Sequence, residues 1–131
     1  MTMIRKKRFI LAAMAILLSV GLLHASVNPT ETKAPAIPDN VKAVIEKSCF
    51  GCHNTDSKND KAKEKLDLKT FDALGKKEMI HALGEIAETV EGNEMPPAKF
   101  LEKFPDKKLT DAEKKILIDW AKSEGKALMK K

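Results

Sequence analysis

Two cysteines and one histidine lie within five residues of each other, in the order Cys49-Phe-Gly-Cys52-His53. Cysteines three positions apart on a helical turn can reach the two vinyl groups along one edge of a porphyrin and form thioethers with them. His53 follows directly, so its imidazole can turn toward the iron of the same ring. The Cys-x-x-Cys-His pattern is the attachment sequence of c-type haem. It predicts one covalently bound haem c, attached through Cys49 and Cys52, with His53 as an iron ligand.

Two other chemistries use cysteines at this spacing. A Cys-x-x-Cys pair can form a disulfide or act as a thioredoxin-like redox pair, but that motif follows a strand in an α/β fold. No segment of this sequence alternates with period two for long enough to form a strand. A structural zinc site generally needs four ligands. Downstream of residue 25 the chain has only these soft ligands: Cys49, Cys52, His53 and His81. Haem is the favoured interpretation, and thiol redox chemistry and zinc are the alternatives.

The second axial position of a haem iron has four candidate ligands downstream of residue 25: Met79, His81, Met95 and Met129. Met79 and His81 lie within a predicted helix, where a partly buried or surface side chain is the ordinary interpretation. Met129 lies two residues from a Lys-rich end that we expect to fray.

Met95 differs from the other candidates because it follows a helix stop. Pro96 and Pro97 restrict its loop, so a thioether can be held against iron with little further loss of entropy. We therefore predict Met95 as the second axial ligand. His81, or an open or weakly ligated site, remains the alternative.

The N-terminal 25 residues have the layout of a secretory signal peptide. Arg5, Lys6, Lys7 and Arg8 precede an apolar run over 9–23, no acidic residue is present, and the small residue Ala25 follows. We predict cleavage after Ala25 and a periplasmic location. An uncleaved anchor in the inner membrane is the alternative.

The leader also accounts for most of the positive charge. The 131-residue chain has 24 Lys and Arg and 19 Asp and Glu, a formal charge of +5. Four of the basic residues lie in the leader, so the exported domain has 20 basic and 19 acidic side chains. A charge near +1 argues against nucleic acid as a partner.

Downstream of the leader, the pattern predicts a Pro-rich linker over 26–38 and a haem-binding domain over 39–131. Apolar residues at helical spacing predict helices from Asp39 or Asn40 to Ser48 and over 77–91, the latter ending at Gly92-Asn93. A third helix begins at the capping-box pattern Thr110-Asp-Ala-Glu113 and continues to Gly125. A surface loop over 54–61 and a short, partly helical stretch over 66–74 connect them. The predicted fold class is all-α, and a domain this small needs a staple such as a cofactor.

Three segments resemble the small haem-binding domain of bacterial periplasmic c-type cytochromes, which is related in general plan to class I cytochromes c. They are Ser48-Cys-Phe-Gly-Cys-His-Asn54, then Glu85-Ile-Ala-Glu-Thr-Val-Glu-Gly-Asn-Glu-Met-Pro-Pro97, then Leu109-Thr-Asp-Ala-Glu113 with Ile118-Asp-Trp120. The resemblance covers about 44–121. It implies crossing N- and C-terminal helices around one haem, with His53 as proximal and Met95 as distal ligand.

The chain departs from the family pattern after the haem motif. Many members have a Pro-Trp-Tyr-like segment there, whereas this chain has Ser57-Lys-Asn-Asp-Lys61 and no tyrosine. We expect Phe71 and Phe100 to supply the missing apolar contact in the pocket wall.

An iron ligated by His and Met has no vacant position for a substrate in either oxidation state, and the thioether favours Fe(II). The expected function is therefore one-electron transfer by a monomer, not catalysis, and no catalytic constellation appears in the sequence. A haem-based ligand binder or sensor with a displaceable sixth ligand is the alternative, followed by a thiol-disulfide redox protein. The expected partners are larger redox proteins, which lysines around an exposed haem edge would steer into contact. The alternative is that these lysines are ordinary solvated surface. The lysines are Lys58, Lys61, Lys76, Lys99 and Lys103.

Overall fold

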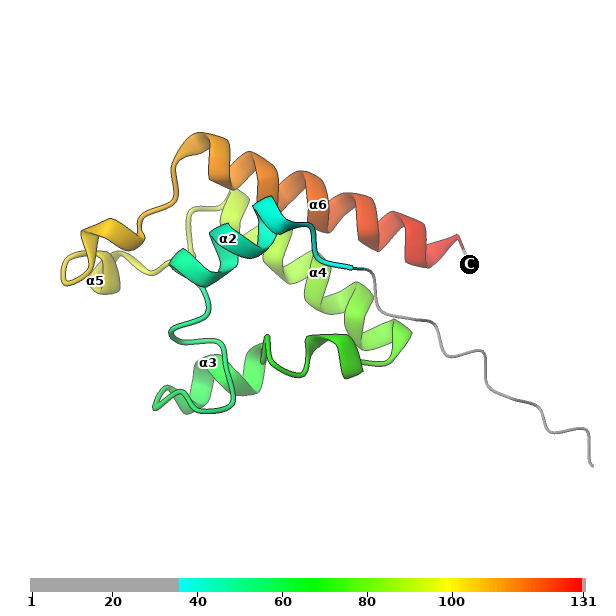
Figure 1. The fold of residues 1–131 in the computed structure, drawn as a ribbon, viewed down its shortest axis with the longest axis horizontal. Coiled ribbons are helices and arrows are strands. Elements are labelled where there is room, and N and C mark those ends of the chain that lie inside the picture. Colours follow the sequence, from blue (N-terminus) through cyan, green and yellow to red (C-terminus); the bar gives the residue numbers. More distant parts are fainter. Residues whose placement is uncertain (1–35, 131) are drawn as a thin grey trace, which may run out of the picture. The chain divides into compact units, whose positions relative to one another are not determined.

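The fold is built on two long antiparallel helices, α4 (Lys76–Glu91) and α6 (Asp111–Met129), which pack along each other (Figure 1). The computed structural model describes residues 36–130. A third helix, α2 (Asp39–Ser48), packs against α6. No strand occurs among the described residues, which confirms the predicted all-α fold.

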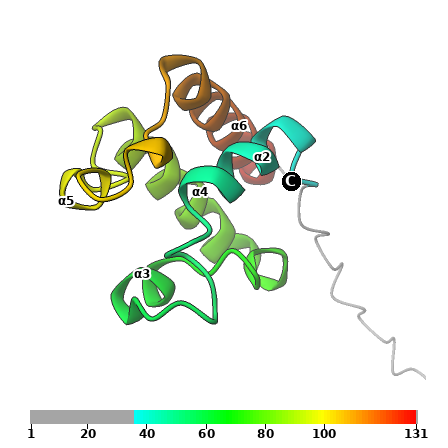
Figure 2. The same ribbon diagram turned by 60° about the vertical axis from the view of Figure 1, so that its left-hand side comes forward.

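Shorter elements connect these helices. Helix α3 (Asp60–Lys65) and the 3-10 turn η1 (Phe71–Ala73) lie between α2 and α4, whereas α5 (Ala98–Leu101) and the 3-10 turn η2 (Pro105–Lys107) lie between α4 and α6. Both views show α3 and α5 as separate projections from the α4–α6 pair (Figure 1, Figure 2). These projections form part of the wall of the site described below.

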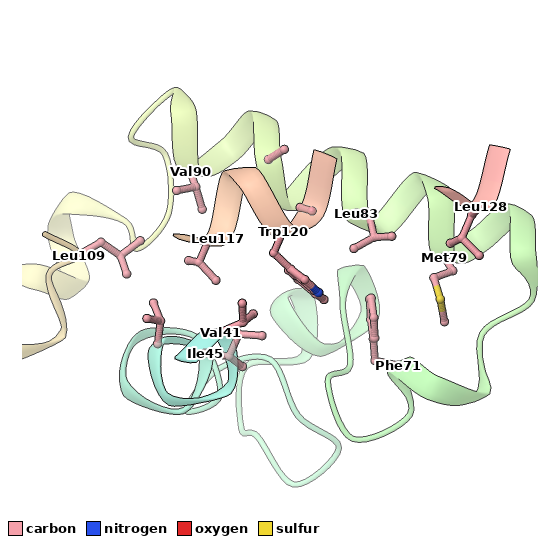
Figure 3. Close-up of a cluster of buried hydrophobic side chains, with 13 residues drawn as sticks. Val41, Ile45, Phe71, Met79, Leu83, Val90, Leu109, Leu117, Trp120 and Leu128 are labelled. Atoms are coloured by element: carbon pink, nitrogen blue, oxygen red, sulfur yellow. The ribbon is translucent and has the colours of Figure 1, made fainter. Parts of the chain in front are cut away.

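The hydrophobic core lies where α2, α4 and α6 meet (Figure 3). Phe71, just before α4, adds its ring to this core and lies 6.1 Å from the Trp120 ring, centroid to centroid. The buried apolar side chains are Val41, Val44, Ile45, Phe71, Met79, Leu83, Ala87, Val90, Leu109, Leu117, Trp120, Ala121 and Leu128. Most of them recur at the three- and four-residue spacing that places one face of a helix against its neighbours.

Helix α6 begins as predicted. The Thr110 side chain accepts a hydrogen bond from the Glu113 backbone N–H at 3.2 Å, and the Glu113 carboxylate accepts one from the Thr110 N–H at 2.8 Å. This reciprocal pair is the capping box, so the prediction from the Thr-x-x-Glu pattern is confirmed.

The predicted end of α6 at Gly125 is wrong. The helix continues to Met129, and Leu128 is buried in the core. Gly125 is buried against α4, where a Cβ atom built at this position would lie 4.0 Å from Leu83 Cβ. Packing against α4 offsets the low helix propensity of glycine, which alone would have favoured a stop.

The predicted loop over 54–61 is also only partly correct, because α3 begins at Asp60. Its short sequence, Asp-Lys-Ala-Lys-Glu-Lys, carries no apolar stripe, so periodicity gives no helix signal. Helix α4 agrees with the prediction to within one residue. Its stop at Gly92-Asn93 is confirmed, with Asn93 rather than the glycine in the left-handed region, at a φ of 56°.

The predicted signal peptide over 1–25, and most of the predicted linker over 26–38, lie outside the described residues. Within 36–130, no helix combines the length and apolar character that a membrane crossing requires.

Candidate functional site

The residues singled out in the sequence meet at one cavity of about 740 Å³. Its wall is made by the end of α2, by α3, by one face of α4 and by the loop that leads into α5. Cys49, Cys52, His53 and Met95 all line it, although Met95 is far from the others along the chain. The volume lies within the range of small-molecule and cofactor sites.

The cysteines lie on a tight turn that continues from α2. The Cys49 N–H donates to the Ile45 carbonyl at 2.8 Å, and the N–H groups of Cys52 and His53 both donate to the Cys49 carbonyl at 3.1 Å. Both thiols are free and half-buried. Burial, and secondly the neighbouring Cys52, raise the pKa of the Cys49 thiol to about 11, so this thiol stays protonated at neutral pH.

His53 is oriented by the C-terminal end of α3. Its Nδ1 atom lies 3.0 Å from the Ala62 carbonyl oxygen and 3.2 Å from the Leu66 carbonyl oxygen. Carbonyl oxygens only accept hydrogen bonds, so this geometry assigns the ring proton to Nδ1 as the donor. The lone pair of Nε2 is then available for a metal, and the hydrogen bond at Nδ1 fixes the ring.

Asn54 stabilises the turn that carries His53. Its side-chain amide donates to the Phe50 carbonyl, and its side-chain oxygen accepts from the Asp56 N–H at 2.8 Å. Asn54 is buried, although it is polar. The sequence analysis assigned Asn54 no role, although its bond from the Asp56 N–H is an Asx turn, a local pattern that asparagine favours.

Met95 reaches the cavity from the loop after α4. The N–H groups of Glu94 and Met95 both donate to the Thr89 carbonyl, at 2.8 and 3.3 Å, so the loop folds back on the end of α4. Pro97 is the N-cap residue of α5. The Met95 side chain lines the cavity and remains 38% exposed.

The other candidate ligands are placed differently. Met79 is buried in the core, and Met129 is 62% exposed near the end of α6. Neither lines the cavity, whereas His81 lines it from an exposed position on α4. The structure therefore brings His53 together with Met95 and His81, and with neither of the other two methionines.

Phe100 lines the cavity as expected, and its ring lies 4.9 Å from that of Phe104, centroid to centroid. The expectation for Phe71 is wrong. Its side chain is buried against Trp120 and does not line the cavity. The sequence does not distinguish these two phenylalanines, and only the tertiary structure decides which of them reaches the cavity wall.

The donor set and the walls fit a flat metal macrocycle better than a bare metal ion. Two thiols, an imidazole with an available Nε2 and a thioether share a cavity whose remaining wall is largely apolar: Ile45, Ala62, Leu66, Leu68, Ala82, Ile86, Val90, Pro96, Pro97, Phe100, Leu109 and Leu117. The buried Ser48 hydroxyl, also on this wall, has no hydrogen-bond partner in the protein. Over 36–130, no three or more His, Cys, Asp or Glu side chains are grouped to hold a metal ion.

A family model described as "Haem-binding domain" matches residues 56–123. The matched range begins just after His53 and contains α3, α4, the Met95 loop and much of α6. No curated protein and no solved structure matches the chain.

Proposed function

Because the chain belongs to the haem-binding domain family, and so binds haem, we propose that it is an exported monohaem c-type cytochrome that carries single electrons. The observation that carries the proposal is the meeting of Cys49, Cys52, His53 and Met95 at one cavity. The family match supports haem as the ligand of that cavity.

In this proposal each of the four residues has a distinct task. Cys49 and Cys52 would hold the macrocycle through thioether bonds, and His53 and Met95 would ligate the iron. The bound group supplies the one-electron chemistry. The two carbonyls at the end of α3 keep the His53 proton on Nδ1 and so keep Nε2 free for the iron. The thioether and the apolar wall favour Fe(II).

Occupation of both axial positions by side chains favours electron transfer over catalysis, because no position is left for a substrate. The second candidate is a ligand-binding or sensor module in which Met95 is displaced. The partial exposure of Met95 supports this alternative, since an entering ligand would have to move only one side chain at the protein surface.

The expected partners are redox proteins with an acidic surface, and the face around α5 is the best supported docking site. Phe104 is exposed, and Phe100 links it to the cavity. Lys99, in α5, and Lys103, two residues after its end, are exposed. An apolar contact flanked by lysines suits brief docking with a partner that is rich in carboxylates. Lys58, Lys61 and Lys76, elsewhere in the chain, are also exposed. We expect the exported domain to act as a monomer in the periplasm.

A decisive experiment expresses the protein together with a haem-attachment system. Haem that remains on the protein after acid-acetone extraction would support the thioether bonds, and its loss would exclude both them and the c-type assignment. A ferrous protein that binds CO readily at neutral pH would favour the sensor.

The axial assignment is tested with Met95→Ala. We expect a lower reduction potential and loss of the thioether-to-ferric charge-transfer band, because the soft ligand that favours Fe(II) is removed. Met129→Ala is the matched control, since Met129 is exposed and lies outside the cavity. An unchanged spectrum of Met95→Ala would exclude Met95 as the ligand.

A further inference from the structure

One side chain of α6 reaches across to the Met95 loop. Lys114 donates a hydrogen bond from Nζ to the Asn93 side-chain oxygen at 2.7 Å. Asn93 lies two residues before Met95, and its φ of 56° places it in the left-handed region. This region is unfavourable for most residues and is tolerated best by glycine and asparagine. The contact therefore holds the residue at which the chain reverses direction after α4.

The helix end that carries Lys114 is itself well anchored. The Lys114 N–H donates to the Thr110 carbonyl at 2.9 Å, within the turn closed by the capping box. Glu113 forms an ion pair at 2.8 Å with Lys47 of α2. The Lys114 side chain is only 27% exposed, and it also lies 3.5 Å from the Asp111 carboxylate. Lys114 is thus a fixed point from which the loop can be held.

The rest of the loop has few contacts of this kind. The N–H groups of Glu94 and Met95 are both held by the Thr89 carbonyl, which belongs to the same helix end as the loop. A second contact with α6 is the ion pair of Lys122 with Glu91 at 2.9 Å. Glu91 is the last residue of α4 and precedes Asn93, so this ion pair holds α4 rather than the loop. Of these two polar contacts from α6, the Lys114 hydrogen bond has the partner nearer to Met95 along the chain.

We propose that Lys114 is a positioning residue for Met95, which holds the Asn93 reversal and so keeps the sixth position of the iron closed. The proposal rests on the proposed function, because it takes Met95 as the axial ligand. The proposal also bears on the two candidate functions. An intact hydrogen bond between Lys114 and Asn93 suits an electron carrier, and loss of this bond would make Met95 easier to displace, as a sensor requires.

The test compares Lys114→Ala with Lys115→Ala in the haem-loaded protein. Lys115 is the adjacent residue of the same helix; its side chain is 75% exposed and, within residues 36–130, pairs only with Asp119. We expect amide hydrogen exchange at Glu94 and Met95 to become about three- to tenfold faster in Lys114→Ala, the range for loss of one hydrogen bond. Imidazole should bind the ferric protein faster by a similar factor. Neither rate should change in Lys115→Ala.

Asn93→Gly separates the side-chain contact from the backbone. Glycine adopts the left-handed conformation easily, so this variant loses the acceptor of the Lys114 bond but keeps the reversal available. It should therefore behave like Lys114→Ala in both measurements.

Equal exchange rates in the Lys114 and Lys115 variants would overturn the proposal, and so would faster exchange without faster imidazole binding. A failure of the proposed function is seen separately, because it appears as an unchanged spectrum in Met95→Ala. The exchange measurement itself requires no assumption about the ligand.

Discussion

Under the proposed ligation of iron by His53, removal of the cap of α3 should change the reduction potential, because Ala62 links this cap to His53. The Asn59 side-chain oxygen accepts a hydrogen bond from the Ala62 N–H at 3.2 Å. The Ala62 carbonyl accepts the hydrogen bond from His53 Nδ1 at 3.0 Å. Asn59→Ala removes the first contact and leaves every atom of the second in place. We therefore expect the effect on His53 to pass through the stability of α3. Because Asn59 also lines the cavity, the His53 ring resonances, and not the potential alone, report this route.

The expected size follows from the shortness of α3. Loss of an N-cap side chain costs about 1 kcal/mol, and a helix of six residues is far too short to be stable alone. Lys63 makes two further local contacts, a hydrogen bond to the Ser57 carbonyl at 3.2 Å and an ion pair with the Asp60 carboxylate at 2.8 Å. A loss of about 1 kcal/mol should shift the equilibrium between formed and frayed α3 about fivefold.

Fraying of α3 removes the acceptors of the His53 N–H. A hydrogen bond at Nδ1 makes the imidazole a more basic ligand, which stabilises the ferric state. Its weakening should raise the reduction potential and broaden the resonances of the His53 ring. The assay is a voltammogram together with a proton NMR spectrum of the haem-loaded protein, and urea unfolding measures the accompanying loss of stability.

Leu128→Ala is the control, because Leu128 is buried in the core near the end of α6 and does not line the cavity, so its truncation lowers stability without touching α3. A general loss of stability would move the unfolding midpoint in both variants but the potential in neither. The reasoning is refuted if Asn59→Ala destabilises the protein by the expected amount and leaves the potential and the His53 resonances unchanged.

Two further predictions concern α6 and its contacts. Gly125→Ala should stabilise the fold by up to about 1 kcal/mol in urea unfolding, because alanine favours helix and its Cβ would make an ordinary contact with Leu83 at 4.0 Å; a lower midpoint would contradict this. Glu113 has a lowered pKa, caused first by its hydrogen bond from Lys47 and then by that from the Thr110 N–H. A carboxylate with a lowered folded-state pKa contributes stability above its ordinary pKa of 4.5, and this contribution is lost as the pH falls through the folded-state value. Glu113→Gln should therefore be less stable than the unaltered protein at pH 7 and should lose less stability on acidification. An unaltered pH dependence would show that the contacts of the Glu113 carboxylate contribute nothing to stability.

Much of the fold was predictable because its signals are local. The apolar spacing in α4 placed that helix to within one residue, and the Thr110 and Glu113 pattern located the start of α6. Helix α3 escaped prediction because it has no apolar face, and its formation depends on contacts with the turn that carries His53. Gly125 misled the prediction for α6 because its cost in helix propensity is offset by packing against Leu83.

The residues of the candidate site also differ in how far the sequence alone predicted them. Cys49, Cys52 and His53 are adjacent in the chain, so their spacing alone indicated their chemistry. Among four candidates for the second axial position, the sequence favoured Met95 because it follows a helix stop and precedes two prolines. The structure places Met79 in the core and Met129 at an exposed helix end, and it leaves Met95 and His81 at the cavity.

The sequence by itself determined the helical class and the main helices, and it contains the Cys-x-x-Cys-His motif from which haem attachment is predicted, because each depends on residues within a few positions of one another. Only the tertiary structure decided which carbonyls hold His53, which methionine shares its cavity and which lysine holds the Met95 loop. These contacts join segments that are separated along the chain, such as Lys114 and Asn93. Their distances are set by how α2, α4 and α6 pack, and no local pattern encodes that packing.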